Sequence, residues 1–230
     1  MASPAILTTT RTEDLLAHLP TRRTTEYAKG QTIYGAQACS DSIYLVVEGK
    51  VAISQVAENG REILLEIVPP EELFGESAFL DTPLRAERAV AIEDTQVMTW
   101  AISDIEDLVT KRPRLAVALL QVLAQRNAEF SRRIESFSID SIERRLARSL
   151  LRLSQRLGTA APDGTVMMMP ISQTLLSQYV GTSREIVSHY MNRFRRLGHV
   201  SYSRRGIVIY QDSFQAMLYG AGFPAAEPGS

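Results

Sequence analysis

The chain has 230 residues, a formal net charge of −1 at pH 7 and 45% hydrophobic residues, which suits one or two globular domains. It has no apolar run near the roughly 20 residues that a membrane helix needs, and its start lacks the basic-then-apolar pattern of a secretory signal, so we expect a cytoplasmic protein without membrane partners. Cys39 is the only cysteine, which excludes internal disulfides and an all-cysteine iron–sulfur or zinc site within one chain.

Residues 25–101 are predicted to form an all-β domain. Short apolar-rich runs alternate with glycine-containing loops, and a further strand pair is expected between residues 87 and 100. Regular short strands with such turns are typical of a jelly roll or barrel. The three runs are Ser42–Val47, Lys50–Val56 and Glu62–Val68, and the loops are Glu48-Gly49 and Glu58-Asn59-Gly60.

The segment FGESAFLDTPLRA, residues 74–86, interrupts this strand pattern. Gly75 permits close approach of the backbone to a ligand. A carboxylate at Glu76 and a guanidinium at Arg85 could bracket a sugar hydroxyl and a phosphate. The residue types leave open that Glu76 and Arg85 form a structural ion pair in a roll that binds nothing, or something else.

From residue 115 to 137 the pattern becomes helical, with apolar residues three and four apart over about six turns. The stripe is narrow and carries one polar residue, Asn127, which favours pairing with a second copy of the helix in a register that Asn127 fixes. The alternative is packing against the β domain of the same chain. The stripe consists of Ala116, Leu119, Leu123, Asn127, Phe130, Ile134 and Phe137.

The segment from Ile171 to Gly206 reads as two helices around a tight turn, followed by a basic hairpin. The first helix contains Leu175, Leu176, Tyr179 and Val180, and Gly181 supplies the turn. Thr182 and Glu185 have capping-box spacing, so the second helix is predicted to begin there and to end at Gly198. Its buried stripe is predicted to be Val187, Tyr190, Phe194 and Leu197, and the hairpin strands are predicted at His199–Tyr202 and Gly206–Tyr210.

The opposite face of the second helix is polar and suits contact with base edges and phosphates, although an ordinary solvated face is the alternative. The distribution of charge favours the first interpretation. Residues 1–110 hold 8 Lys/Arg and 18 Asp/Glu, a net charge of −10, whereas residues 111–230 hold 17 Lys/Arg and 8 Asp/Glu, a net charge of +9. A basic half attached to an acidic one indicates a domain that neutralises phosphate.

Two other classes of protein fit less well. A cupin-like metalloenzyme needs histidine ligands in the barrel, but the three histidines, His18, His189 and His199, lie outside it. We therefore expect no catalytic residues and no metal site. An interaction module that binds a cyclic nucleotide without binding DNA is disfavoured by the segment 171–210.

Taken together, these parts resemble the cyclic-AMP receptor protein/FNR family of bacterial transcription regulators. The resemblance covers about Asp14 to Ser213 and rests on IYLVVEGKVAIS (43–54), FGESAFLD…LRA (74–86) and LSQYVGTSREIVSHYMNRFRRLG (176–198). It implies an α+β fold with a cyclic-nucleotide-binding-like β-roll (jelly roll), a long central dimerisation helix and a C-terminal winged helix-turn-helix. It also implies a homodimer on an inverted-repeat operator, controlled allosterically by a small ligand, with RNA polymerase as a partner.

The corresponding domains are an effector-sensing roll at 1–112, a dimerisation helix at 113–138, a winged helix-turn-helix at 139–220 and a flexible tail at 221–230. The segment Ser136–Asp140 weakens the helix and is predicted to be the hinge that couples ligand binding to DNA binding.

For DNA, the positions that resemble family base contacts are Arg184, Glu185 and His189, although many members carry arginine at the position of His189. Ser188 resembles the FNR branch, whereas the Arg184-Glu185 pair resembles the cyclic-AMP branch. We therefore expect an inverted repeat but do not predict its base sequence. Phosphate contacts are expected from Thr182, Ser183, Arg204 and Arg205.

For the effector, Gly75, Glu76 and Arg85 match family positions that engage the ribose and cyclic phosphate, and Ser77 lies in the same segment. Ala86 departs from the serine or threonine that such members often have, which removes one hydroxyl donor to the phosphate. Phe130 and Ser131 stand where members place contacts to the base. A cyclic nucleotide such as cAMP is the favoured effector, and two alternatives remain open: another small ligand such as a 2-oxoglutarate-like anion, or no ligand. No tightly bound cofactor is expected.

Overall fold

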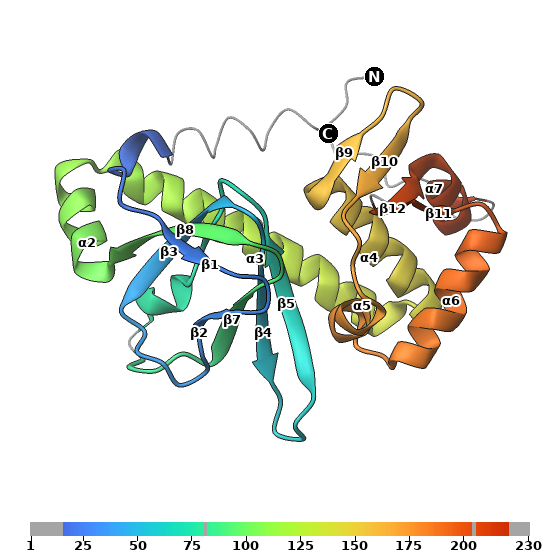
Figure 1. The fold of residues 1–230 in the computed structure, drawn as a ribbon, viewed down its shortest axis with the longest axis horizontal. Helices are drawn as coiled ribbons and strands as arrows, with labels where there is room; N and C mark the ends of the chain where they lie inside the picture. The colour runs from blue at the N-terminus through green and yellow to red at the C-terminus, as the bar shows by residue number, and fades with distance from the viewer. Residues whose placement is uncertain (1–15, 81, 204–205, 221–230) are drawn as a thin grey trace, which may run out of the picture. The chain divides into compact units, whose positions relative to one another are not determined.

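The computed structural model describes residues 16–80, 82–203 and 206–220. The predicted tail at 221–230 and the predicted phosphate contacts Arg204 and Arg205 lie outside the described residues. The chain divides into two compact units, Met1–Arg133 and Ile134–Ser230. The predicted α+β architecture of a β-roll, a long helix and a winged helix-turn-helix is confirmed (Figure 1).

The first unit contains two antiparallel four-stranded sheets, with strand orders β1-β8-β3-β6 and β2-β7-β4-β5. The Glu58-Asn59-Gly60 loop joins β4 and β5 in a hairpin, as predicted. The Glu48-Gly49 loop, also predicted to form a hairpin, instead passes from β3 in one sheet to β4 in the other, so that prediction is wrong. The elements are β1 (Thr25–Tyr27), β2 (Thr32–Tyr34), β3 (Ser42–Glu48), β4 (Val51–Val56), β5 (Glu62–Val68), β6 (Leu73–Phe74), the 3-10 helix η2 (Glu76–Phe79), β7 (Glu87–Ala91), β8 (Thr95–Ala101) and α2 (Ile102–Lys111).

The roll has two apolar clusters. In one, Leu115 and Ala118 of the long helix α3 (Arg114–Ile139) pack with Ile43 and Trp100 of the first sheet. The other fills the space between strands with Val46, Val97 and aromatic rings, of which Tyr34, Tyr44 and Phe74 lie within 5.0–6.1 Å of one another between ring centroids. This aromatic cluster forms the environment of the predicted effector segment.

One face of α3 is bound to the roll through polar contacts as well as apolar ones. The Arg133 guanidinium donates to the carbonyls of Leu64 and Leu65, at 2.6 and 2.7 Å, and the Arg126 guanidinium donates to the carbonyl of Leu73. Most of the predicted stripe lies on another face: Leu123, Phe130, Ile134 and Phe137 are exposed, together with Val117 and Leu120, whereas Ala116 and Leu119 are half-buried.

The second unit begins with the last turn of α3. Ser136 is buried there and its hydroxyl donates to the Asp140 carboxylate at 2.6 Å, which also lies 3.6 Å from Arg144 Nε and 3.3 Å from Arg148 Nε. Ser141 then caps α4 (Ile142–Leu157) by accepting the backbone N–H of Arg144. The predicted hinge segment thus contains the end of one helix and a charged junction before the next.

The rest of this unit is a winged helix-turn-helix. Its four-stranded antiparallel sheet has the order β11-β12-β10-β9. Buried side chains of α4 and α6 contribute to its core, including Leu146, Leu150, Val187 and Phe194. The elements are β9 (Gly158–Ala160), β10 (Thr165–Met168), α5 (Gln173–Val180), α6 (Arg184–Arg196), β11 (Val200–Ser203), β12 (Gly206–Tyr210) and α7 (Gln211–Tyr219).

Two details of the second helix differ from the prediction. Helix α6 begins at Arg184 with Ser183 as its cap, one residue later than the capping box at Thr182 suggested, because the Ser183 hydroxyl accepts the N–H of Ile186. Leu197 lies beyond the helix and is 55% exposed, whereas Met191 is buried beside Val187 and Phe194.

Candidate nucleic-acid interface and effector site

The turn between α5 and α6 depends on glycine for two reasons. Gly181 has a φ of 72°, and a Cβ built on it would lie 2.8 Å from Cε1 of Phe137. The N–H groups of Gly181 and Thr182 both donate to the carbonyl of Ser177, at 2.9 and 3.1 Å. These contacts fix the angle at which α6 leaves the turn.

The first turn of α6 exposes the predicted base-contacting residues. Arg184 and Glu185 are both exposed, next to the exposed cap Ser183, and Thr182 is half-buried. The backbone N–H of Glu185 and the Ser183 hydroxyl lower the pKa of the Glu185 carboxyl, so this group is ionised and able to accept a hydrogen bond. The helix therefore presents a cation and an anion side by side at one end.

Two other predicted DNA contacts differ in their availability. His189 is exposed and lies edge-to-face on Tyr190, with ring centroids 5.1 Å apart. Ser188 is half-buried, and its hydroxyl faces the Arg184 carbonyl at 2.9 Å and the side-chain oxygen of Gln173. Ser188 thus links α6 to α5 through Gln173, a residue that the sequence interpretation did not single out.

The last turn of α6 adds cations beyond those predicted. Arg193, Arg195 and Arg196 are all exposed, and Arg193 Nε lies 3.3 Å from a carboxylate oxygen of Glu143 in α4. The sequence RFRR at 193–196 carried this signal, because basic side chains near a helix C-terminus can neutralise nearby phosphate as well as the helix dipole.

The predicted effector segment places Arg85 in the interior of the roll, with its side chain fully buried. Its Nη1 donates to the Gly75 carbonyl at 3.1 Å and to the Ser77 hydroxyl at 2.9 Å, and its Nη2 donates to the Ser42 carbonyl. The guanidinium also stacks on Tyr34, 4.1 Å from the ring centroid. Within the described residues, Nε alone of its nitrogens lacks a hydrogen-bond partner.

Gly75 is required for this arrangement. Its φ is 84°, and an added Cβ would lie 3.0 Å from the Tyr44 ring and 3.3 Å from Arg85 Nη1. The glycine does allow close approach, as expected, but the group that approaches it in the structure is the side chain of Arg85.

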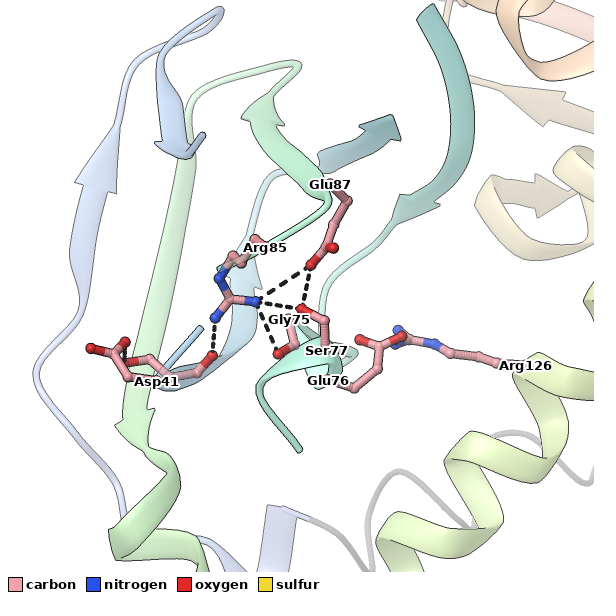
Figure 2. A network of polar contacts seen from close by, with 8 residues as sticks. Asp41, Gly75, Glu76, Ser77, Arg85, Glu87 and Arg126 are labelled. Atoms are coloured by element: carbon pink, nitrogen blue, oxygen red, sulfur yellow. Dashed lines mark hydrogen bonds and ion pairs between the residues drawn. The ribbon is translucent and has the colours of Figure 1, made fainter. Parts of the chain in front are cut away.

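Glu87 provides the negative charge beside Arg85. The Ser77 hydroxyl donates to Glu87 Oε1 at 2.5 Å, and the same oxygen lies 3.5 Å from Arg85 Nη1. Figure 2 shows Arg85 pointing toward Gly75, Ser77 and Glu87. Glu87 was not among the predicted site residues, although it follows Arg85 by two positions and therefore lies on the same side of an extended strand.

Glu76 has a different partner. Its carboxylate lies 2.5 Å from Nη1 of Arg126 on α3, whose Nε is 3.5 Å from Glu66 (Figure 2). The sequence left open a structural ion pair between Glu76 and Arg85. In the structure Glu76 pairs with Arg126 instead. Arg126 was also missed, although its spacing of 8 residues from Ala118 keeps it near the buried side of the helix.

The structure brings together Gly75, Glu76, Ser77 and Arg85 but not the remaining predicted effector contacts. Ala86 is exposed, and so are Phe130 and Ser131, whose hydroxyl donates to the Asn127 carbonyl of its own helix at 2.9 Å. Phe130 and Ser131 therefore lie on the exposed side of α3.

Among the described residues there is no cluster of three or more His, Cys, Asp or Glu that could hold a metal ion. Over the same residues, none of the helices combines the length and the apolar character needed to span a membrane.

Comparison with known proteins agrees with the two halves of the structure. Residues 24–112 match the cyclic nucleotide-binding domain family, and residues 144–212 match the Crp-like helix-turn-helix domain family. The chain is 31% identical over 174 residues to the cyclic AMP receptor protein of Thermus thermophilus, covering 76% of this chain and 77% of the relative. It is 28% identical over 184 residues to a CRP-like cAMP-activated global transcriptional regulator of Mycobacterium tuberculosis, covering 80% and 82%.

Among solved structures, FixK2 from Bradyrhizobium japonicum has the same fold, with a TM-score of 0.75 and 23% sequence identity. That similarity covers 90% of this chain and 100% of the other chain.

Proposed function

Because the chain belongs to the cyclic-AMP receptor protein/FNR family of transcription regulators, we propose that it works as a homodimer that reads an inverted repeat in double-stranded DNA. The family membership makes it a DNA-binding regulator of transcription and not an enzyme. The proposal that this chain reads bases rests on the first turn of α6, where Arg184 and Glu185 are exposed beside the helix cap.

The chemistry of this turn suits direct reading of bases in the major groove. Arg184 can donate two hydrogen bonds to O6 and N7 of guanine, and the ionised Glu185 can accept one from N4 of cytosine. Each such pairing discriminates by about 1–3 kcal/mol against a wrong base. His189 lies on the next turn and adds one hydrogen bond to a base or phosphate.

Phosphate contacts are proposed at the same helix end. Thr182 and Ser183 lie at the N-terminal end of α6, where the helix dipole favours an anion. Arg204 and Arg205, which follow β11 in the sequence and lie outside the described residues, remain predicted phosphate contacts. These groups position the protein on DNA without specifying a sequence.

The homodimer is supported by the outer face of α3. Leu120, Leu123, Phe130 and Ile134 are between 37% and 66% exposed and repeat at helical spacing, with Asn127 among them. An apolar row of this length on one helix favours pairing with an identical helix, which removes the row from water. RNA polymerase remains a predicted partner.

The proposal is tested by selecting binding sites from random duplexes and by sedimentation of the purified chain. We expect a dimer and an inverted repeat whose half-sites are roughly 34 Å apart, one turn of DNA. The proposal would be contradicted if the chain sedimented as a monomer and bound no duplex DNA, with or without small anions and nucleotides.

A further inference from the structure

We propose that Glu87 is a specificity-determining residue, which supplies Arg85 with a counter-charge from the chain itself and thereby excludes cyclic nucleotides from the roll. The exclusion goes beyond the proposed function and is independent of it. Only the consequence for DNA binding, given below, rests on that function.

A cyclic nucleotide carries one negative charge on its phosphate and hydroxyl groups on its ribose. Burying that phosphate requires a cation with free donors, because an unpaired buried charge is strongly destabilised. The buried cations of the described roll and its helix are Arg85, Arg126 and Arg133. Arg133 already donates to the carbonyls of Leu64 and Leu65.

Arg85 has only part of its donor set left for an incoming phosphate. Both of its terminal nitrogens donate within the protein, to the carbonyls of Gly75 and Ser42 and to the Ser77 hydroxyl, which leaves Nε–H and one N–H of Nη2 among its five donors. The Glu87 carboxylate faces the same Nη1 at 3.5 Å and is held by the Ser77 hydroxyl at 2.5 Å. A phosphate at this position would meet a carboxylate of the same charge in a buried environment, where screening is weak.

Glu76 is partly committed as well. Its Oε1 pairs with Nη1 of Arg126 at 2.5 Å, so one of the two carboxylate oxygens that could accept a ribose hydroxyl already faces a cation of the chain. Arg126 also donates to the Leu73 carbonyl and lies 3.5 Å from Glu66, and its side chain is only 8% exposed. The roll and α3 are therefore tied together by protein groups where a ligand would otherwise bridge them.

If the roll is complete without a nucleotide, the ligand-free protein already has its roll–helix contact, and DNA binding should not require cAMP. This differs from the cyclic nucleotide that the sequence alone favoured as effector. A ligand can shift an equilibrium only through differential contacts with the two states, and here the chain itself already supplies the counter-charge of Arg85.

The experiment compares wild type, Glu87→Ala and Glu93→Ala by calorimetric titration with cAMP and cGMP. Glu93 is the matched control, because it also pairs with a cation of the roll, Lys50, at 2.7 Å. We expect wild type and Glu93→Ala to bind with dissociation constants weaker than about 1 mM. Glu87→Ala, which leaves Arg85 without a counter-charge, should bind at least about tenfold more tightly and gain thermal stability in inorganic phosphate.

Should Glu87→Ala fail to fold, Glu87→Gln keeps the shape and removes only the charge, and it should show the same phosphate-dependent rise in melting temperature. Micromolar binding of cAMP by wild type, lost in Arg85→Ala, would overturn the proposal, as would identical responses of the Glu87 and Glu93 variants.

A second arm measures the affinity of wild type for its selected DNA site with and without cAMP, where we expect a change below about twofold. A tenfold or larger gain with cAMP would refute the inference. A complete lack of DNA binding would instead contradict the proposed function, and the titrations would still decide the question of exclusion.

Discussion

Replacing Gly181 with alanine tests whether the turn between α5 and α6 is held by backbone conformation alone or also by contact with Phe137. A residue with a side chain at this φ of 72° pays about 1–2 kcal/mol for the left-handed conformation. In addition, the new Cβ would lie 2.8 Å from Phe137 Cε1, and crowding of this kind costs about 1–3 kcal/mol. We therefore expect a total loss of about 2–5 kcal/mol of unfolding free energy in this unit.

Gly198 is a matched control, because its φ is 75° and an added Cβ would meet nothing within 4 Å. Gly198→Ala should lose only the backbone part, about 1–2 kcal/mol. Combining Gly181→Ala with Phe137→Leu should recover about 1 kcal/mol or more, because leucine lacks the crowded ring carbon.

The assay is urea unfolding followed by circular dichroism, with fluorescence of Trp100, the single tryptophan, as a reference for the roll. The fluorescence midpoint should not move. Equal losses for the two glycine variants, or no coupling between positions 181 and 137, would refute the reasoning.

Three further results are expected. Arg184→Ala should lower affinity for the selected site by about 1–3 kcal/mol and relax the preference at one base pair, whereas Arg196→Ala at the other end of α6 should weaken all sequences equally; equal losses for both variants in band-shift titrations would remove Arg184 from base reading. Leu120→Asp on the 65% exposed position of α3 should shift sedimentation toward monomer, while Val56→Asp, at a 51% exposed position of the roll, should not. Burial lowers the pKa of His199 below its ordinary value of 6.5. Its neutral form is therefore favoured in the folded state, so stability is fully present above pH 6.5 and falls as the pH drops through and below that value. His199→Asn should flatten this dependence in unfolding experiments at several pH values, and an unchanged slope would contradict it.

Much of the fold could be predicted because its longer elements carry strong periodic patterns. The strands β3, β4 and β5 follow apolar runs between glycine turns, and α3 follows a long stripe. The strands β1 and β6 were not predicted, since they contain only 3 and 2 residues and are defined by their partners across the sheet. The same holds for β9, which exists because it pairs with β10.

The candidate sites show the same difference between local features, which a sequence reveals, and tertiary contacts, which it does not. The exposed turn of α6 could be predicted, because a cap and an amphipathic pattern are local features of the sequence. The partners of Arg85 and Glu76 could not, because Arg126 is 50 positions from Glu76 and only the folded roll brings them within 2.5 Å. A pattern identifies which groups can carry charge, whereas tertiary structure decides which charges neutralise each other.

The contacts of Asp140 limit the conformations that the junction before α4 can adopt. One carboxylate, 3% exposed, faces the guanidinium groups of Arg144 and Arg148 and accepts from Ser136. Separating the carboxylate from either arginine would leave a buried charge incompletely paired, so intermediate geometries are disfavoured. We therefore expect this junction to adopt a few discrete conformations and not a continuous range of them. High salt should weaken it less than it weakens exposed ion pairs.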